Sequence, residues 1–95
     1  MKEGYVYMLT NKPLGVLYLG VTNDLARRLE QHRSGAVSSF TKHYNAYRLV
    51  WFEHFDNIHD ARLVEARMKK WNRIWKISRI VERNPMWDDL SEQLL

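Results

Sequence analysis

The sequence predicts an α+β fold: a small three-stranded antiparallel sheet flanked by helices, in the element order ββαβαα. The first observation is a pair of strand-forming runs, 5–9 and 16–21, separated by turn residues, which indicates a β-hairpin. The second is a similar run over 48–55. The third is a recurrence of apolar residues every three or four positions after that run, which is typical of helices that cover a sheet.

The two hairpin strands are expected to differ in strength. Tyr5–Leu9 is an uninterrupted apolar run, which predicts a strand buried on both faces. Residues 11–15 are turn formers. Val16–Val21 supplies the second strand, but Gly20 weakens it unless another group approaches its backbone closely.

A helix is expected over residues 24–33, just after the hairpin. Each residue of Thr22–Asp24 suits the N-cap position, and the Ser-Gly pair at 34–35 suits the end of the helix. Residues 36–47 then favour a loop, because serines and an asparagine interrupt any helical pattern there.

The second half of the chain is predicted to be one strand followed by helices. The strand covers 48–55, a helix follows near 58–72, and 73–82 continues it after a bend. The Asn-Pro pair at 84–85 breaks the helix, and 86–94 forms a short last helix or a turn. The apolar positions expected to form the buried face are Ala61, Val64, Met68, Trp71 and Trp75.

Length and composition narrow the class of protein. The chain has 95 residues, which suits one domain over 1–95, and its 45% apolar and 13% aromatic content excludes a disordered tail. Cysteine is absent, which excludes disulfides, thiol catalysis and cysteine-bound zinc. Charged residues interrupt every apolar window before 18 residues, and no signal peptide pattern opens the chain. We therefore expect a cytoplasmic protein with no membrane association.

The net charge of +4 is unevenly distributed along the chain. Residues 61–83 hold eight Lys or Arg against two Glu, whereas 84–95 hold three acids and no base. Because the basic segment also contains Trp71 and Trp75, it is suited to meet a phosphate backbone and to stack on bases. The alternative is a helix whose outer face is simply solvated by Lys and Arg.

Arg28 and His32 form the first unusual feature. They lie on or beside the apolar stripe that Leu25 and Leu29 give the first helix. A cation and an imidazole next to an apolar face often mark a functional site. The alternative is that the stem of Arg28 covers the core while His32 hydrogen-bonds a carbonyl group.

The tyrosines and one glutamate are the other unusual features. Tyr7 and Tyr18 fall on the two hairpin strands, where tyrosine is also an ordinary strand former. Glu65 stands alone among basic residues, as a lone metal ligand on a phosphate-attracting surface would. The alternative for Glu65 is a helical ion pair with Lys69, four residues on.

These features fall together in one known pattern. Tyr5-Val6-Tyr7, followed by Tyr18-Leu19-Gly20 so that Tyr18 comes 11 residues after Tyr7, resembles the signature triplets of the GIY-YIG endonuclease superfamily. The first triplet has Tyr in place of Gly and Val in place of Ile, and the second has Leu in place of Ile.

The resemblance extends from about residue 5 to residue 90. The stretch from Thr22 to His32 is similar to the family's first helix with its functional arginine, here Arg28. The stretch around Glu65 resembles the helix that carries the metal-binding glutamate. Residues 84–90 are similar to the closing segment of small stand-alone bacterial members.

The resemblance implies a metal-dependent endonuclease that hydrolyses DNA phosphodiester bonds. It assigns one Mg²⁺ or Mn²⁺ ion to Glu65 and the phosphate to Arg28. Tyr7 and Tyr18 flank the attacking water, one of them as general base, and His32 orients a tyrosine hydroxyl or relays its proton. A free phenol has a pKa near 10, and a neighbouring arginine and cation are expected to lower it.

Further residues are expected around the site. Gly20 and Asn84 support it, with His43 as a neighbour. The residues expected to contact nucleic acid are Lys42, Arg67, Lys69, Lys70 and Arg73.

Two other functions remain open from the sequence. The fold can serve as a nucleic-acid-binding module without catalysis, or as a protein-interaction domain that uses Trp87 and the acidic tail. For the nuclease, a structure-selective role in DNA repair or recombination is expected. Because many relatives carry a separate DNA-recognition domain, a homodimer or a protein partner would supply the specificity.

Overall fold

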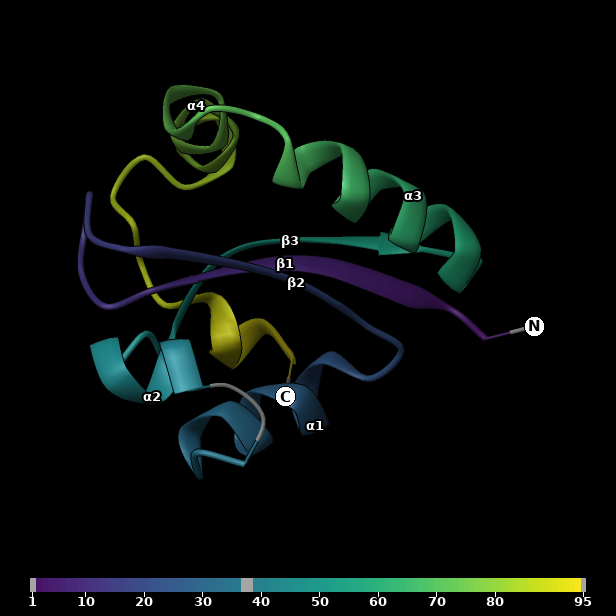
Figure 1. Cartoon of the computed structure of the whole chain (residues 1–95), viewed down its shortest axis with the longest axis horizontal. Coiled ribbons are helices and arrows are strands. Elements are labelled where there is room, and N and C mark those ends of the chain that lie inside the picture. The colour runs from purple at the N-terminus through teal and green to yellow at the C-terminus, as the bar shows by residue number, and fades with distance from the viewer. Residues whose placement is uncertain (1, 37–38, 95) are drawn as a thin grey trace.

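In the computed structural model, which describes residues 2–36 and 39–94, a three-stranded sheet lies between two layers of helices (Figure 1). The helices α3 and α4 cover one face, and α1 and α2 cover the other. The described elements are β1 (Gly4–Thr10), β2 (Leu17–Thr22), α1 (Leu25–Arg33), α2 (Ser39–Tyr44), β3 (Arg48–Phe55), α3 (Ile58–Lys69), α4 (Arg73–Arg83) and the 3₁₀ helix η1 (Leu90–Leu94). The predicted α+β class and the antiparallel three-stranded sheet are confirmed. None of the helices in this described part is long and apolar enough to cross a membrane.

The central strand β1 pairs antiparallel with both neighbours, in the order β2-β1-β3. Tyr7 lies opposite Gly20 of β2 on one side and opposite Phe52 of β3 on the other. The register of β1 with β3 shifts between Met8 and Leu9, which leaves Val50 as an extra residue on β3. This β-bulge places two consecutive residues, Val50 and Trp51, in the same core.

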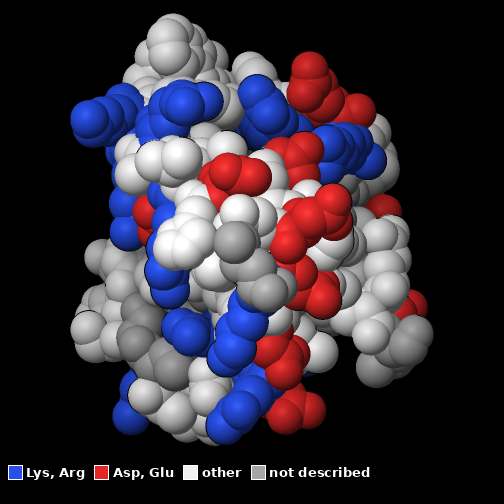
Figure 2. Space-filling model, turned by 90° about the vertical axis from the view of Figure 1, so that its right-hand side faces the viewer, with Lys and Arg blue, Asp and Glu red and all other residues white. Residues whose placement is uncertain are grey.

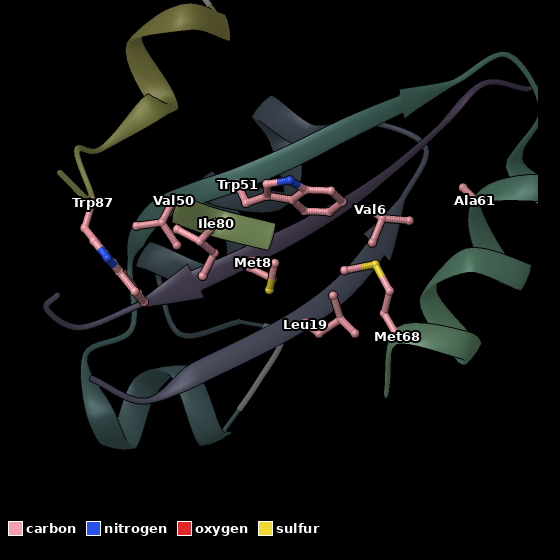
Figure 3. Packing of buried hydrophobic residues seen from close by; sticks show 9 residues of the cluster. All are labelled: Val6, Met8, Leu19, Val50, Trp51, Ala61, Met68, Ile80 and Trp87. Atoms are coloured by element: carbon pink, nitrogen blue, oxygen red, sulfur yellow. The ribbon is translucent and has the colours of Figure 1, made fainter. Parts of the chain in front are cut away.

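Alternate residues of β1 point into two separate cores. Val6 and Met8 enter the core under α3 and α4, which is wholly apolar in its fully buried members (Figure 3). Tyr7 and Leu9 enter the core under α1, together with Leu25. Because successive side chains of a strand point to opposite faces, one short strand serves both layers. The predicted burial of both faces of this strand is confirmed.

The closing segment after α4 crosses the edge of β3 and reaches the other layer (Figure 1). The Asn84 amide nitrogen donates to the carbonyl of Val50 (3.1 Å) and to that of Asp88 (2.9 Å). It thereby satisfies a carbonyl group at the bulge, which a buried position requires. Trp87 is 4% exposed and belongs to the apolar core, so the idea that it forms an accessible interaction surface is wrong.

The expected loop over 36–47 is wrong, because the described part of this range contains α2. Residues 37 and 38 of that range lie outside the described residues. Asn45, with φ of 54°, takes the left-handed conformation that ends a helix, and the Ala46 N–H donates to the Thr41 carbonyl at 2.9 Å. This is the capping pattern of a helix end, so an asparagine typical of loops here terminates a helix.

The predicted burial of Trp75 is also wrong. The chain turns after Lys69, and the side chain of Asn72 accepts from the Trp75 N–H at 2.9 Å to begin α4. The helix axis therefore changes, and the spacing that buries Ala61 and Met68 no longer applies beyond the turn. Trp75 is left 58% exposed.

Candidate active site

The site forms where β2 faces the layer of α1. Tyr7 is fully buried, and its ring lies across Gly20 on the neighbouring strand. A Cβ atom at Gly20 would lie 2.5 Å from the Tyr7 hydroxyl oxygen, closer than any real side chain allows. The expected close approach to the Gly20 backbone is therefore confirmed, and the approaching group is the phenol of Tyr7.

Helix α1 brings His32 to this phenol. The helix begins after Asp24, whose carboxylate accepts from the Arg27 N–H at 3.2 Å. The buried stripe of Leu25, Leu29 and His32 faces the sheet, as predicted. His32 Nε2 lies 2.8 Å from the Tyr7 hydroxyl oxygen.

The other ring nitrogen of His32 has a partner in α2. Nδ1 lies 3.1 Å from the hydroxyl oxygen of Thr41, which is itself fully buried. Burial, with a smaller effect from Arg28, lowers the pKa of His32 to about 4. The imidazole is therefore neutral at pH 7, and a neutral imidazole has one donor and one acceptor nitrogen with which to bridge two hydroxyl groups.

The phenol of Tyr7 is held in its protonated form by the protein's own surroundings. Burial raises its pKa well above 10, and Tyr18 and Glu65 add to the rise. Arg28 acts in the opposite direction but does not overcome the burial. Arg28 thus lowers the pKa of Tyr7, as expected, but by less than burial raises it.

Tyr18 is half-buried beside this pair and faces a surface groove. The centroid of its ring lies 6.3 Å from that of Tyr7 and 5.0 Å from that of His32. On its other side the ring of Phe40 lies at 6.1 Å. The groove residues are Leu17, Tyr18, Leu19, Phe40, Lys69 and Lys76. Lys69 and Lys76 therefore border Tyr18, which is the half-exposed member of the cluster formed by Tyr7, Tyr18 and His32.

Glu65 reaches the site from α3, on the opposite face of the sheet. Its side chain is 12% exposed, and the Lys69 ammonium nitrogen lies 2.9 Å from its Oε2. The alternative of a helical ion pair is therefore present in the structure. The hydrogen bond from Glu65 raises the pKa of Lys69, and the charge of Glu65 makes a small contribution to the raised pKa of Tyr7. Because Lys69 borders the groove of Tyr18, its ion pair places Glu65 next to that groove.

The metal-binding capacity of this carboxylate depends on ligands from outside the protein. No group of three or more His, Cys, Asp or Glu gathers anywhere in residues 2–36 and 39–94. An all-protein cage is therefore not formed by these residues. The donor set fits Mg²⁺, which is often held by one or two carboxylates while water and substrate phosphate complete its shell.

Arg28 lies where α1 approaches the beginning of α3. It is half-buried and lines a hollow that also contains Lys2 and Arg62. Three cations around one hollow favour an anion, and the guanidinium group can grip two phosphate oxygens at once. On the face shown in Figure 2, basic side chains lie mostly along the left and bottom, and acidic ones lie mostly toward the right.

The remaining predicted residues are not all placed together. Lys42, Arg67 and Lys70 are exposed on α2, on α3 and just after it. Arg73 is bound to the hairpin turn, because its Nη2 donates to the carbonyls of Leu14 (2.7 Å) and Gly15 (2.6 Å).

Two predicted neighbours of the site have other partners. Asn84 holds the bulge of β3, as described above. The ring of His43 packs edge-on against that of Tyr44 at 4.7 Å.

Three residues that lie beside His32 or line the groove of Tyr18 were not predicted from the sequence. Thr41 and Phe40 lie in α2, which was predicted as loop, so their helical placement gave no signal. Lys76 was counted only as part of the basic segment.

The comparisons with known proteins agree with the geometry. Residues 3–78 match the model of the GIY-YIG catalytic domain. The chain belongs to the GIY-YIG family, which is a family of nucleases.

Its relatives carry the name UPF0213 protein. One from Pediococcus pentosaceus is 35% identical over 75 residues, covering 79% of each chain. Another from Clostridium perfringens is 35% identical over 80 residues, covering 84% of this chain and 85% of the relative. The solution NMR structure of a UPF0213 protein from Bacillus halodurans matches with a TM-score of 0.58 and 27% identity over 95% of both chains.

Proposed function

We propose that this protein is a metal-dependent endonuclease that hydrolyses phosphodiester bonds of DNA. One observation supports the proposal: in a GIY-YIG domain, the hydrogen-bonded pair of Tyr7 and His32 lies beside the half-exposed Tyr18, whose groove is bordered by Lys69, the ion-pair partner of Glu65. Hydrolysis needs an acceptor for the proton of water, relief of phosphate charge and support for the leaving oxygen. These residues and Arg28 can supply the first two needs and hold the ion that supplies the third.

Glu65 would hold a single Mg²⁺ or Mn²⁺ ion. When bound, the ion relieves the charge of the phosphate and stabilises the leaving 3′ oxygen. The Lys69 ammonium group now occupies one oxygen of Glu65 and must give way to the ion. Because Lys69 is 58% exposed, it can turn into the groove and contact the DNA backbone.

The tyrosine pair and His32 supply the base. In the tautomer with its proton on Nδ1, His32 accepts from the Tyr7 hydroxyl through Nε2 and thereby orients the phenol beside Tyr18. Tyr18 lies at the groove, where it can hydrogen-bond the attacking water or the phosphate. Arg28 grips the phosphate oxygens as negative charge develops on them.

Contacts to the flanking phosphates would come from Lys42, Arg67, Lys69 and Lys70. Such contacts position the backbone without reading its sequence, which favours recognition of DNA structure over sequence. This is the basis for a structure-selective role in repair or recombination. A second copy or a protein partner would narrow the choice of target.

The proposal is tested by incubating the protein with single-stranded, nicked, flapped and branched DNA in Mg²⁺, Mn²⁺ or a chelator. We expect cutting of at least one substrate with either metal ion and none with the chelator. Intact DNA in every lane with metal would refute the nuclease, and equal cutting in the chelator would refute the role of the metal ion.

A non-catalytic nucleic-acid-binding module is the second candidate. The ion pair between Glu65 and Lys69 favours it, because it gives the carboxylate a structural role on the helix. This candidate predicts salt-sensitive DNA binding with no cutting under any of the conditions above.

A further inference from the structure

Trp71 and Trp75 form an aromatic corner at the junction of α3 and α4. Their ring centroids lie 6.2 Å apart and their planes meet at 77°. Trp71 packs partly against the apolar core, whereas Trp75 keeps 58% of its surface in solvent. Core packing therefore explains the first tryptophan and not the second.

The corner encloses a hollow with a cation beside it. The guanidinium carbon of Arg79 lies 5.0 Å from the Trp71 ring centroid, in the range of a cation–π contact. The Glu82 carboxylate lies 3.7 Å from Arg79 Nε and helps to hold that side chain. Ser78 completes the lining. The hollow measures about 260 Å³.

We propose that this hollow binds an unpaired nucleobase of a single-stranded DNA segment. Its volume is below the ~300–1,000 Å³ of pockets for drug-sized molecules, which suits one planar ring system. An exposed indole offers a face on which any base can stack, and the nearby guanidinium plane adds a second flat surface. Ser78 and Glu82 offer polar atoms to the edge of the base.

The charge around the hollow favours a nucleic-acid strand as its occupant over a second copy of the chain. The hollow is bordered by Arg79, and the same stretch carries Lys70, Arg73 and Lys76. Two copies meeting at this surface would bring like charges together. A nucleic-acid strand instead neutralises those cations with its phosphates and releases counterions.

The hollow is connected to the candidate active site through Lys76. This residue follows Trp75 in α4 and borders the groove that contains Tyr18 and Lys69. A strand with a phosphate at Tyr18 can therefore pass Lys69 and Lys76 and place a more distant base at Trp75. This placement of the strand rests on the proposed function, whereas binding of a base in the hollow does not.

The test measures binding in a chelator, so that no cutting is needed. Fluorescence anisotropy of labelled oligothymidylate is recorded with the native protein, Trp75→Ala, Trp75→Phe and Ile74→Ala across a salt series. Ile74 is the matched control, because it is 72% exposed on the same helix. An abasic strand of the same length serves as the control for the base.

We expect Trp75→Ala to weaken binding roughly tenfold, Trp75→Phe to restore most of it and Ile74→Ala to change it less than twofold. The slope of log Kd against log salt concentration should stay unchanged, because none of these substitutions removes a charge. The native protein should bind the abasic strand about as weakly as Trp75→Ala binds oligothymidylate.

Three results would overturn the proposal: equal binding by Trp75→Ala and the native protein, equal binding of abasic and base-containing strands, or a dimer that Trp75→Ala dissolves. If the native protein cuts nothing with metal ions while these binding results hold, the nuclease is refuted and the base site remains.

Discussion

The two faces of the sheet are built from the same strands but for different purposes. Under α3 and α4, Val6 and Met8 enter a core whose buried side chains are apolar apart from the indole nitrogens. Under α1, the intervening Tyr7 enters a core that contains a hydrogen-bonded chain of buried hydroxyl and imidazole groups. A buried polar network is costly unless every member is satisfied, and we infer from this cost that the network on the α1 side serves the proposed site.

From this comparison we infer that, if the proposed function holds, the protein separates stability from chemistry. Successive side chains of β1 point to opposite faces of the sheet, so neighbouring residues belong to different layers. We therefore expect a substitution at Met8 to act mainly on stability and one at Tyr7 to act mainly on the proposed site. Glu65 is the exception, because it belongs to α3 and yet pairs with Lys69, which borders the groove of Tyr18. The predictions below test this separation, beginning with the largest effect.

Tyr7→Phe should lower the cutting rate by roughly 10²–10⁴-fold, the range for loss of a general acid–base group. The change also leaves His32 Nε2 without its partner, which costs about 1–3 kcal/mol in the free energy of unfolding. Cutting is measured at a temperature where circular dichroism shows the variant folded. Unchanged cutting would remove Tyr7 from the site.

Met8→Ala is the matched change on the other face. Met8 is fully buried in the apolar core, so we expect a loss of about 2–5 kcal/mol in the free energy of unfolding. The cutting rate per folded molecule should stay within about twofold of the native protein. Urea unfolding and a cutting assay at low temperature measure the two quantities. A large loss of cutting in folded Met8→Ala would mean that the two faces are not separate.

Acid should destabilise the protein through His32. Between a pKa of about 4 in the folded state and about 6.5 in the unfolded state, only the unfolded chain binds this proton. The free energy of unfolding therefore falls as pH drops from about 6.5 to about 4, by about 3 kcal/mol from this group.

Urea unfolding at several pH values measures the effect, and the pH slope over this window should become shallower in His32→Gln. The control His59→Gln, which changes an exposed histidine, should keep the native slope. An equal slope in His32→Gln and the native protein would contradict the burial of a neutral imidazole.

Thr41→Val should have the smallest effect. The substitution keeps the shape of the side chain but removes the hydroxyl group that contacts His32 Nδ1. We expect a loss of about 1 kcal/mol in the free energy of unfolding and a fall in cutting of roughly tenfold or less, because Thr41 acts only by positioning His32. Thr41→Ser should restore both. Failure of serine to restore cutting would show that the methyl group, and not the hydroxyl, matters.

Local patterns in the sequence were sufficient for the sheet and for the helices α1, α3 and α4. The apolar run of Tyr5–Leu9 and the Asp24 cap are short-range signals, and both were confirmed. The contact of Gly20 with another group also followed from local reasoning, although the identity of that group did not.

Long-range contacts account for what the sequence could not predict. Helix α2 has six residues, too few for a helical pattern, and depends on the burial of Thr41 against α1. The bulge at Val50 depends on Asn84, 34 residues later in the chain. Trp75 follows the helical spacing of Ala61 and Met68 in the sequence, but it lies in α4, which begins after Asn72 on a different axis. In each case a tertiary contact decides what the local pattern leaves open.

The most direct test of the central claim compares cutting and DNA binding in Glu65→Gln. The control is Glu30→Gln, an exposed acid on α1. If Glu65 holds the metal ion, Glu65→Gln should cut at least ~100-fold more slowly in Mg²⁺ or Mn²⁺. It should bind DNA as well as the native protein or better, because Lys69 is released from its ion pair. Glu30→Gln should cut normally. Cutting by Glu65→Gln at the native rate would contradict the account.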